Sequence, residues 1–184
     1  MTVALAKWTL EEYHRMVESG VLDDRNVELI RGEIVELPSE GKPHAYAVSE
    51  SGEYLARLLG DDAKIRYGNP ITLPNGSEPQ PDIAVVQRLG REYLGHHPYP
   101  ENACWLIEYS NTSLSKDLNL KSQVYAEASI SEYWIVNLAT QELIVFRNPQ
   151  NDQYLSQASY TDGQIKPLSF PEISVDIQAI INRL

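Results

Sequence analysis

Apolar residues recur at two different periods along this chain, and each period predicts one kind of element. A spacing of three to four residues marks one face of a helix, whereas strict alternation marks a half-buried strand. The helical spacing occurs three times and is bounded by residues typical of helix ends, such as Thr9 with Glu12 as a capping box and Gly60 as a stop. The predicted helices cover residues 9–19, 44–59 and 115–128.

Alternating or continuous apolar runs predict the strands. The first two runs flank Arg31-Gly32 and predict a β-hairpin, because glycine takes the positive φ that a tight turn needs. Residues 103–109 are apolar on both alternating faces, which is typical of a central strand covered on both sides. The predicted strands are 27–30, 33–37, 63–67, 70–73, 82–86, 103–109, 132–138 and 141–147. Segment 74–80 reads as a turn-rich loop, 90–100 as a long surface loop, and the remainder as strand fragments with a short terminal helix.

The order of these elements predicts an α/β protein of the mixed α+β kind. The chain has 184 residues, of which 42% are hydrophobic and 22% charged, and these values fit one domain spanning residues 1–184. The single cysteine, Cys104, lies in an apolar run, so we expect a small buried side chain rather than a protease nucleophile. Such cysteine use, with no signal-like start and no apolar stretch near the roughly 20 residues of a membrane span, predicts a cytoplasmic protein that does not enter membranes.

The charge balance excludes one class of function. Lys and Arg number 15 against 26 Asp and Glu, which gives a formal net charge of -11. A protein that coats nucleic acid through bulk charge needs an excess of cations, because its affinity comes from releasing phosphate counterions. The charge balance does not exclude a local cluster of basic residues.

Two carboxylates stand at strand ends. Asp82 follows Pro81 at the start of a predicted strand, and Glu108 lies near the end of strand 103–109 with Ser110 on the same face. Such a carboxylate needs a cation, a hydrogen bond or an opening to water, because burying an unpaired charge is unfavourable. Taken alone, Asp82 also fits an ordinary turn residue after proline.

A lysine interrupts the apolar face of helix 115–128. At about 100° per residue, Lys121 falls near the centre of the arc formed by Leu114, Leu118, Tyr125 and Ala128. A charge on the face that a helix presents to a sheet breaks the binary pattern. Either Lys121 pairs with Asp117 one turn earlier, or its ammonium points at the carboxylates of the preceding strands.

Two carboxylates and a lysine fit the hydrolysis of phosphodiester bonds. Asp82 and Glu108 are the predicted metal ligands for a hard divalent cation, Mg²⁺ with Mn²⁺ as the alternative, through their oxygen atoms. The cation would lower the pKa of a bound water, and Lys121 would orient that water or stabilise the charge that develops. All three are predicted catalytic residues.

The residues also resemble known nucleases. Pro81-Asp82 followed by Glu108-Tyr109-Ser110 resembles the PD-(D/E)XK signature, with serine where lysine usually stands and Lys121 as the migrated lysine. More closely, nearly the whole chain resembles the Uma-two endonuclease family. The segments that carry this resemblance are Val-Glu-Leu-Ile-Arg-Gly-Glu-Ile at 27–34, His44, Pro-Asp-Ile-Ala-Val-Val at 81–86, Leu-Ile-Glu-Tyr-Ser at 106–110, Asp117 with Lys121 and Tyr125, and Glu-Tyr-Trp-Ile-Val at 132–136.

The resemblance implies a restriction-endonuclease-like fold, in which helices flank a mixed central sheet and an N-terminal helix and β-hairpin precede it. It further implies a metal-dependent deoxyribonuclease that acts on DNA and often forms homodimers. Glu28 would be an additional acidic catalytic residue beside Asp82, Glu108 and Lys121. From the residues alone the role of Glu28 stays open, because the hairpin alternation does not decide which face is buried.

Several other side chains favour structural interpretations. His44 is more typical of a helix start than of a ligand. The neighbours His96 and His97 would point to opposite sides of an extended segment and chelate poorly, so we expect a solvated loop. Tyr133, Trp134, Phe146 and Tyr154 are expected in the core or in an interface rather than in base stacking, which would also need a positively charged groove.

Two functions therefore remain, a metal-dependent nuclease that cuts DNA and a noncatalytic dimer that keeps the fold as an interaction module. The three retained site residues favour the nuclease. The net charge of -11 favours the module or a narrow substrate, because a DNA duplex is repelled unless basic residues gather around the cleft. The candidate basic residues are Lys42, Lys64, Arg66, Lys116 and Lys121.

Overall fold

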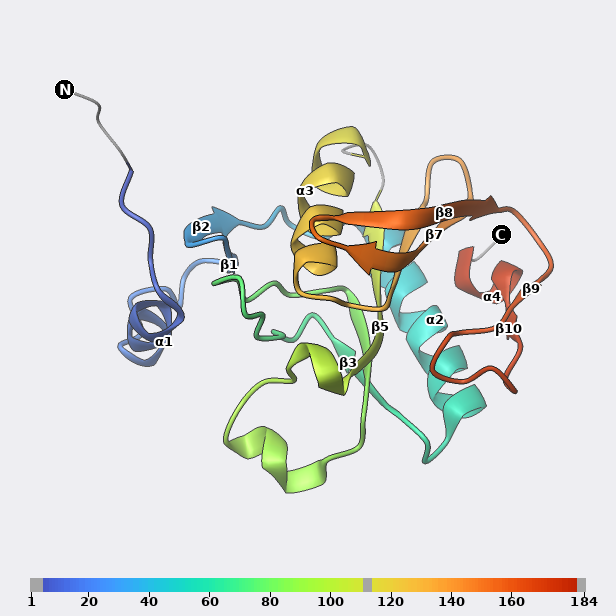
Figure 1. Ribbon diagram of the computed structural model, residues 1–184, viewed down its shortest axis with the longest axis horizontal. Coiled ribbons are helices and arrows are strands. Elements are labelled where there is room, and N and C mark those ends of the chain that lie inside the picture. Colours follow the sequence, from blue (N-terminus) through green and yellow to red (C-terminus); the bar gives the residue numbers. More distant parts are fainter. Residues whose placement is uncertain (1–4, 111–113, 182–184) are drawn as a thin grey trace.

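A six-stranded mixed sheet forms the centre of the protein, of which a computed structural model describes residues 5–110 and 114–181 (Figure 1). The strand order is β3-β4-β5-β6-β7-β8, with β5 and β6 parallel and all other neighbours antiparallel. The strands are β3 (Lys64–Tyr67), β4 (Ile83–Val86), β5 (Ala103–Ser110), β6 (Glu132–Asn137), β7 (Glu142–Gln150) and β8 (Gln153–Tyr160). The predicted mixed α+β fold is confirmed.

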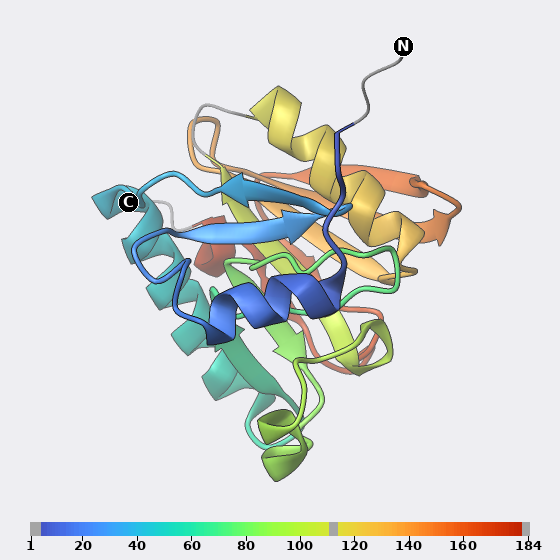
Figure 2. The same ribbon diagram turned by 90° about the vertical axis from the view of Figure 1, so that its left-hand side faces the viewer.

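Helices cover both faces of this sheet. Helices α2 (Lys42–Leu59) and α4 (Ile177–Ile181) pack on one face and α3 (Leu114–Glu127) on the other, so that β5 lies between α2 and α3 in both views (Figures 1 and 2). Along β5, Trp105 and Ile107 belong to the core under α2, whereas Leu106 belongs to the core under α3. The three side chains are fully buried, which confirms the prediction of a central strand covered on both sides.

The N-terminal part forms a smaller unit of one helix and one hairpin. Thr9 and Glu12 make the predicted capping box at the start of α1 (Leu10–Glu18). The hairpin strands are β1 (Val27–Ile30) and β2 (Glu33–Glu36), and the turn between them places Gly32 at φ 77. The hairpin crosses the front of Figure 2 between α2 and α3. Tyr13, Val27 and Leu29 form its own small core.

Hydrogen bonds join this hairpin to the main body. The Glu78 amide donates to the Leu29 carbonyl at 2.7 Å, and the Gly32 amide donates to the Gly76 carbonyl at 3.1 Å. A β-carbon on Gly32 would lie 2.9 Å from the β-carbon of Lys7 and 3.0 Å from the carbonyl oxygen of Trp8, so the turn needs glycine for space as well as for φ. The hairpin is thereby held in one place beside the sheet.

Three predicted segments differ from the structure. Segment 70–73 is not a strand. Pro70 has no amide hydrogen, and the other residues make isolated backbone hydrogen bonds instead of a ladder with one partner strand, such as the bond from Ile71 N to Pro79 O at 3.0 Å. The 90–100 loop contains two 3₁₀ turns, η1 (Gly90–Leu94) and η2 (Pro100–Asn102), the latter extending to residue 102. The C-terminal remainder is more regular than expected, with the eight-residue strand β8 and the short pair β9 (Gln164–Ile165) and β10 (Val175–Asp176) before α4.

The remaining structural predictions can be compared with burial. Cys104 is free and 8% exposed, and burial raises the pKa of its thiol, so it has the environment of a packing residue. Tyr133, Trp134 and Phe146 are buried in the two cores, which leaves little of them for an interface or for stacking on bases. In the described part of the chain, no helix combines the length and the apolar character needed to span a membrane.

Candidate active site

One cavity of about 500 Å³ gathers the predicted site residues. It opens where the hairpin, the first turn of α2, the middle of α3 and the adjoining ends of β4 and β5 meet. Its lining includes Glu28, His44, Asp82, Glu108 and Lys121. The predicted convergence of the four site residues in one place is therefore what the geometry shows.

The register of β4 and β5 brings the two carboxylates together. Ile83 pairs with Ile107 in this antiparallel ladder, so Asp82 and Glu108 stand directly beyond that pair at the same end. Asp82 Oδ2 also accepts a hydrogen bond of 2.6 Å from the backbone amide of Tyr109. Because the strands hold these backbones, the separation of the two carboxylates is fixed by the sheet rather than by a loop.

Lys121 reaches the cavity from the face of α3 that packs on the sheet. Its Nζ lies 2.8 Å from Glu108 Oε1 and 3.2 Å from Glu28 Oε2, and its side chain is only 14% exposed. The alternative partner Asp117 has a side chain outside the described residues. The ammonium therefore pairs with two carboxylates of the cavity and is not directed at bulk solvent.

Glu28 enters from β1 of the hairpin. It is 2% exposed, and its Oε2 accepts a 3.0 Å hydrogen bond from the Gln80 amide, two residues before Asp82. The question left open by the hairpin alternation is thus answered: Glu28 faces inward, toward Lys121. Its carboxylate ties the hairpin to the segment that carries Asp82.

The charges in the cavity shift each other's titration. Burial raises the pKa of Glu108 to about 7, with the negative charges of Asp82 and Glu28 adding to the effect while Lys121 opposes it. Burial alone would lower the pKa of Lys121, but its partners Glu108 and Glu28 outweigh burial and raise it. The site therefore holds more negative charge than its one lysine neutralises, and an added cation would relieve the excess.

Tyr125, one turn after Lys121 on α3, also holds Glu108. Its hydroxyl donates to Glu108 Oε1 at 2.9 Å, and the ring is fully buried. Burial and the nearby carboxylate raise the pKa of Tyr125 strongly, so the phenol stays a donor. Glu108 Oε1 thus accepts hydrogen bonds from both Lys121 and Tyr125.

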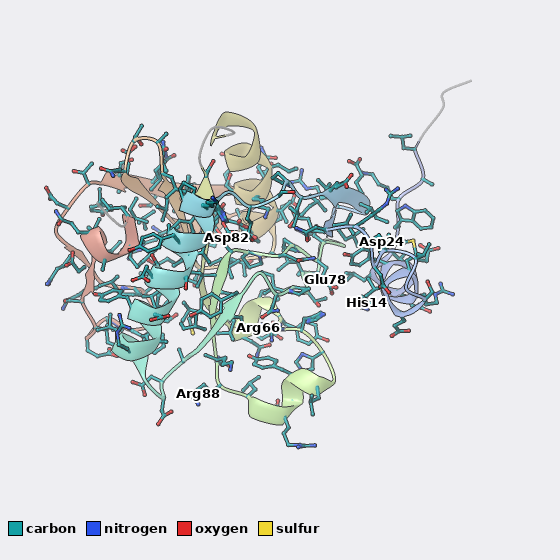
Figure 3. All side chains as sticks on the ribbon, turned by 180° about the vertical axis from the view of Figure 1, so that it is seen from behind. His14, Asp24, Arg66, Glu78, Asp82 and Arg88 are labelled. Atoms are coloured by element: carbon teal, nitrogen blue, oxygen red, sulfur yellow. The ribbon has the colours of Figure 1, made fainter. Side chains whose placement is uncertain are left out.

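The structure also places His44 and Glu40 in this cavity, a position that the sequence did not indicate. Figure 3 shows Asp82 beside the first turn of α2, and His44 Nε2 on that turn lies 3.1 Å from Asp82 Oδ2. The hydrogen bond to Asp82 is the main cause that raises the pKa of His44, and burial partly opposes it. Glu40 Oε2 lies 3.9 Å from His44 Nδ1, so the imidazole stands between two carboxylates.

The other basic residues proposed for the cleft lie elsewhere. Lys64 and Arg66 are on β3, and the Arg66 guanidinium sits 5.5 Å from the centre of the Tyr93 ring. Among the described residues, Lys121 is the single lysine or arginine that lines the cavity, and Lys42 on α2 does not. The side chain of Lys116 falls outside the described residues. The described residues therefore form no basic rim around the cavity.

The paired histidines of the 90–100 loop make ring and loop contacts. His96 stacks on Tyr99 with ring centres 4.7 Å apart, and burial lowers the pKa of His97. His14 forms a separate contact with buried Glu78, where Nε2 lies 2.8 Å from a carboxylate oxygen, away from Asp82 (Figure 3). In the described ranges, the Glu40, His44 and Asp82 group is the one set of three potential metal ligands that converges.

Known proteins resemble this chain in sequence and in fold. The family-wide sequence model of Uma2, described as "Putative restriction endonuclease", matches residues 10–178. A solved structure from Anabaena variabilis, titled a "putative nuclease belonging to DUF820", superposes with a TM-score of 0.73 over 95% of this chain and 97% of that one. Its sequence identity is 20%, so this likeness concerns the fold. Among curated proteins, none matches the chain.

Proposed function

This chain belongs to the Uma2 family, described as "Putative restriction endonuclease", and from this premise we propose that it is a divalent-metal-dependent endonuclease that hydrolyses phosphodiester bonds in DNA. One observation carries the proposal. Asp82 and Glu108 stand side by side across two strands, and the Lys121 ammonium lies 2.8 Å from Glu108 in the same cavity. Two oxygen ligands beside a cationic donor are the groups that phosphodiester hydrolysis needs.

The residues fit a hard divalent cation. Asp82 and Glu108 offer carboxylate oxygens at adjoining strand ends, and Mg²⁺ or Mn²⁺ binds to such oxygens while keeping water in its shell. Burial is the main cause that raises the pKa of Glu108 to about 7, and the charges of Asp82 and Glu28, which a cation at this place would offset, add to it. When bound, the cation lowers the pKa of a coordinated water and neutralises charge on the phosphate.

The chain's own residues supply the rest of the reaction. The Lys121 ammonium would donate a hydrogen bond that orients the attacking water or stabilises the charge that develops on the phosphate oxygens. Glu28, which is 2% exposed and bonded to the Gln80 amide, helps to keep that ammonium in place at 3.2 Å. His44 and the Tyr109 amide fix the orientation of Asp82. These contacts set the geometry before any substrate arrives.

The acidity of the cavity bears on the choice of substrate. Among the described lining residues there are five carboxylates and one lysine, so a phosphate would be repelled from this cavity in the absence of a divalent cation. Binding of DNA is therefore expected to depend on the cation as strongly as cleavage does. The alternative, a noncatalytic interaction module, predicts no such dependence.

Cleavage of plasmid and of single-stranded DNA with Mg²⁺ or Mn²⁺ tests the proposal. Wild type should cut in the presence of either ion and not in EDTA, whereas Asp82→Asn and Lys121→Met should lose about 100-fold or more of the activity. Glu101→Gln, an exposed carboxylate outside the cavity, serves as the matched control and should cut like wild type. Equal cutting by wild type and Asp82→Asn would overturn the site, and no cutting by any protein would favour the noncatalytic module.

The homodimer implied by the family resemblance stays a prediction. The aromatic side chains of β6 and β7 do not support it, because Tyr133, Trp134 and Phe146 are buried within the chain. A mass measured by light scattering at micromolar concentration tests it. Twice the chain mass of 20.8 kDa is the expected result, and a value near 20.8 kDa would refute it.

A further inference from the structure

An arginine on β3, outside the catalytic cavity, lacks the partners that its charge requires. Within the described ranges, Arg66 forms no ion pair, and its guanidinium makes one long hydrogen bond of 3.4 Å, from Nη2 to the Pro70 carbonyl. Its Nε is buried and has no hydrogen-bond partner there. Because a guanidinium carries five N–H donors, most of the donors of Arg66 are left for a ligand or for water.

The charge of Arg66 is partly desolvated and not neutralised. Burial lowers the pKa of the guanidinium, and the Tyr93 phenol partly opposes this effect. Arg147, which is also partly buried, shows how the protein completes such a group. Its guanidinium donates to Glu132 at 2.6 and 2.9 Å and to the Lys166 carbonyl at 2.7 Å. An anion bound at Arg66 would supply the counterion that Glu132 supplies to Arg147.

Three aromatic rings of loop 90–100 continue from this guanidinium. The Arg66 guanidinium lies 5.5 Å from the centre of the Tyr93 ring, which meets the His96 ring edge-on at 6.0 Å. His96 in turn stacks on Tyr99 with ring centres 4.7 Å apart and an angle of 16° between the planes. Tyr99 is 39% exposed, and such a ring offers a surface on which a nucleobase can stack. Arg66 and these three rings are called the arginine–aromatic cluster below.

Hydrogen bonds hold the arginine–aromatic cluster in place. The Tyr93 hydroxyl donates to the Gln87 carbonyl at 2.9 Å, which fixes the ring beside Arg66. The Thr72 amide donates to the Pro98 carbonyl at 2.9 Å, which ties the loop to the segment that follows β3. A cluster fixed in this way has less conformational entropy to lose when a ligand binds.

The position of the cluster relates it to the catalytic cavity. Arg66 pairs with Ala84, two residues after Asp82, so Arg66 and Asp82 project from the same face of the sheet (Figure 3). Gly68, two residues after Arg66, lines the cavity. Two residues of extended chain span about 7 Å. A phosphate at the catalytic carboxylates and a phosphate at Arg66 could therefore belong to one nucleic-acid strand.

We propose that the arginine–aromatic cluster binds single-stranded DNA, with a phosphate on the Arg66 guanidinium and a base on the Tyr99 ring, and leads that strand into the catalytic cavity. The inference rests on the proposed function for the path into the cavity. A single strand fits better than a duplex for two reasons. Its bases are free to stack on protein rings, and it carries half the charge of a duplex per length, which a protein of net charge -11 repels less.

Fluorescence anisotropy with a labelled oligothymidylate in Mg²⁺ tests the inference, in the Lys121→Met background that is expected not to cut. Arg66→Met should weaken binding about tenfold and lower the steepness of the salt dependence by about 0.7, the value for one phosphate contact on a single strand. Arg66→Lys should keep that steepness because it keeps the charge. Tyr99→Leu should weaken binding about tenfold and leave the steepness unchanged, since stacking releases no counterions. Arg88→Met is the matched control and should bind like its parent, because Arg88 is paired with Asp61 at 2.8 Å.

Urea unfolding checks that each variant is folded, and Tyr99→Leu, a change to a partly exposed side chain, keeps the test valid if Arg66→Met does not fold. Unchanged affinity and salt dependence in Arg66→Met would overturn the site. An equal loss of affinity for a blunt duplex would overturn the choice of a single strand. The mononucleotide dTMP offers the same phosphate and base, and displacement of the strand by dTMP at a comparable concentration would identify a free-nucleotide site instead.

The outcomes also separate this inference from the proposed function. Cleavage that Asp82→Asn abolishes, together with unchanged binding by Arg66→Met, would overturn the arginine–aromatic cluster as a DNA site and leave the proposed nuclease. Binding that depends on Arg66, in a protein that cuts no DNA, would overturn the nuclease and leave the cluster as a site for single-stranded DNA.

Discussion

Two glutamates on neighbouring strands, the fully buried Glu132 and the mostly buried Glu108, differ in the partners that balance their charge. Glu132 on β6 has no exposed area, and its carboxylate accepts from the Arg147 guanidinium at 2.6 and 2.9 Å, from Trp134 Nε1 and from the Leu168 amide. Glu108 on β5 accepts from Lys121 and Tyr125 through one oxygen, and it shares that lysine with Glu28.

The difference lies in how completely each charge is balanced. Glu132 has one guanidinium of its own and further N–H donors, so its charge is neutralised within the protein. Glu108 shares one ammonium with Glu28, and burial raises its pKa to about 7, with the nearby charges of Asp82 and Glu28 adding to the effect. The first arrangement is complete by itself, whereas the second leaves a charge for a ligand to neutralise.

The largest effect on stability is expected at Glu132, whose charge is balanced within the protein. Glu132→Gln leaves the mostly buried Arg147 without its counterion, so the free energy of unfolding should fall by about 3 kcal/mol. Urea unfolding measures this change. The control is Glu142→Gln on β7, for which we expect a change within about 0.5 kcal/mol. A change of similar size in both variants would show that Glu132 does not stabilise the fold through its charge.

The next effect is the pH dependence of stability, which tests whether the charge of Glu108 is only partly balanced. The folded-state pKa of Glu108 is about 7 and its ordinary value is 4.5, so between these values the unfolded chain binds fewer protons. Stability should therefore fall as pH rises from 5 to 7.5, by on the order of 2 kcal/mol from this group. Glu108→Gln removes the group and should flatten that part of the profile.

Urea unfolding of both proteins without metal, at several pH values, gives the two profiles. Subtracting them isolates Glu108 from the other titrating groups, including His44. Parallel profiles for wild type and Glu108→Gln would mean that the carboxylate titrates normally, and the comparison with Glu132 would lose its electrostatic basis.

A smaller effect separates hydrogen bonds to a charge from those to a neutral group. The Tyr125 hydroxyl donates to Glu108, whereas the Tyr154 hydroxyl donates to the Ile130 carbonyl at 2.8 Å. Removing either hydroxyl should lower stability by about 1 kcal/mol. The loss in Tyr125→Phe should be larger at pH 8 than at pH 5.5, because the acceptor is then ionised. Tyr154→Phe should lose the same amount at both, and equal pH behaviour of the two variants would contradict the account.

Much of the fold could be predicted from the sequence because local signals and tertiary packing agree. The capping box at Thr9 and Glu12, the turn at Gly32 and the doubly covered strand 103–109 are each set by residues close in sequence. The prediction of a strand at 70–73 was wrong because local pattern and tertiary packing disagree there. The segment's apolar residues Ile71 and Leu73 are buried, but they pack under α3 without a strand partner, and periodicity alone does not show partners.

The residues of the candidate site could likewise be predicted only where a local sequence signal marks them. Asp82, Glu108 and Lys121 could be found because each breaks an apolar pattern or matches a nuclease motif. His44 and Glu40 break no pattern, since a histidine and a glutamate at a helix start are ordinary there. Their position in the cavity becomes visible only in the fold, which brings the first turn of α2 beside Asp82, 38 positions from His44 along the chain. Contacts at such separation are set by topology.

Thermal melting with and without Mg²⁺ tests the central claim most directly, because it examines the metal site without a known substrate. Wild type should gain roughly 1 to 3 kcal/mol when Mg²⁺ exceeds its dissociation constant 10- to 100-fold. Asp82→Asn should melt at or above wild type in EDTA, since one repelling charge is gone and its amide oxygen still accepts from the Tyr109 amide, and it should lose most of the Mg²⁺ gain. A destabilised Asp82→Asn beside a wild type that does not respond to Mg²⁺ would contradict the claim that these carboxylates form a metal site.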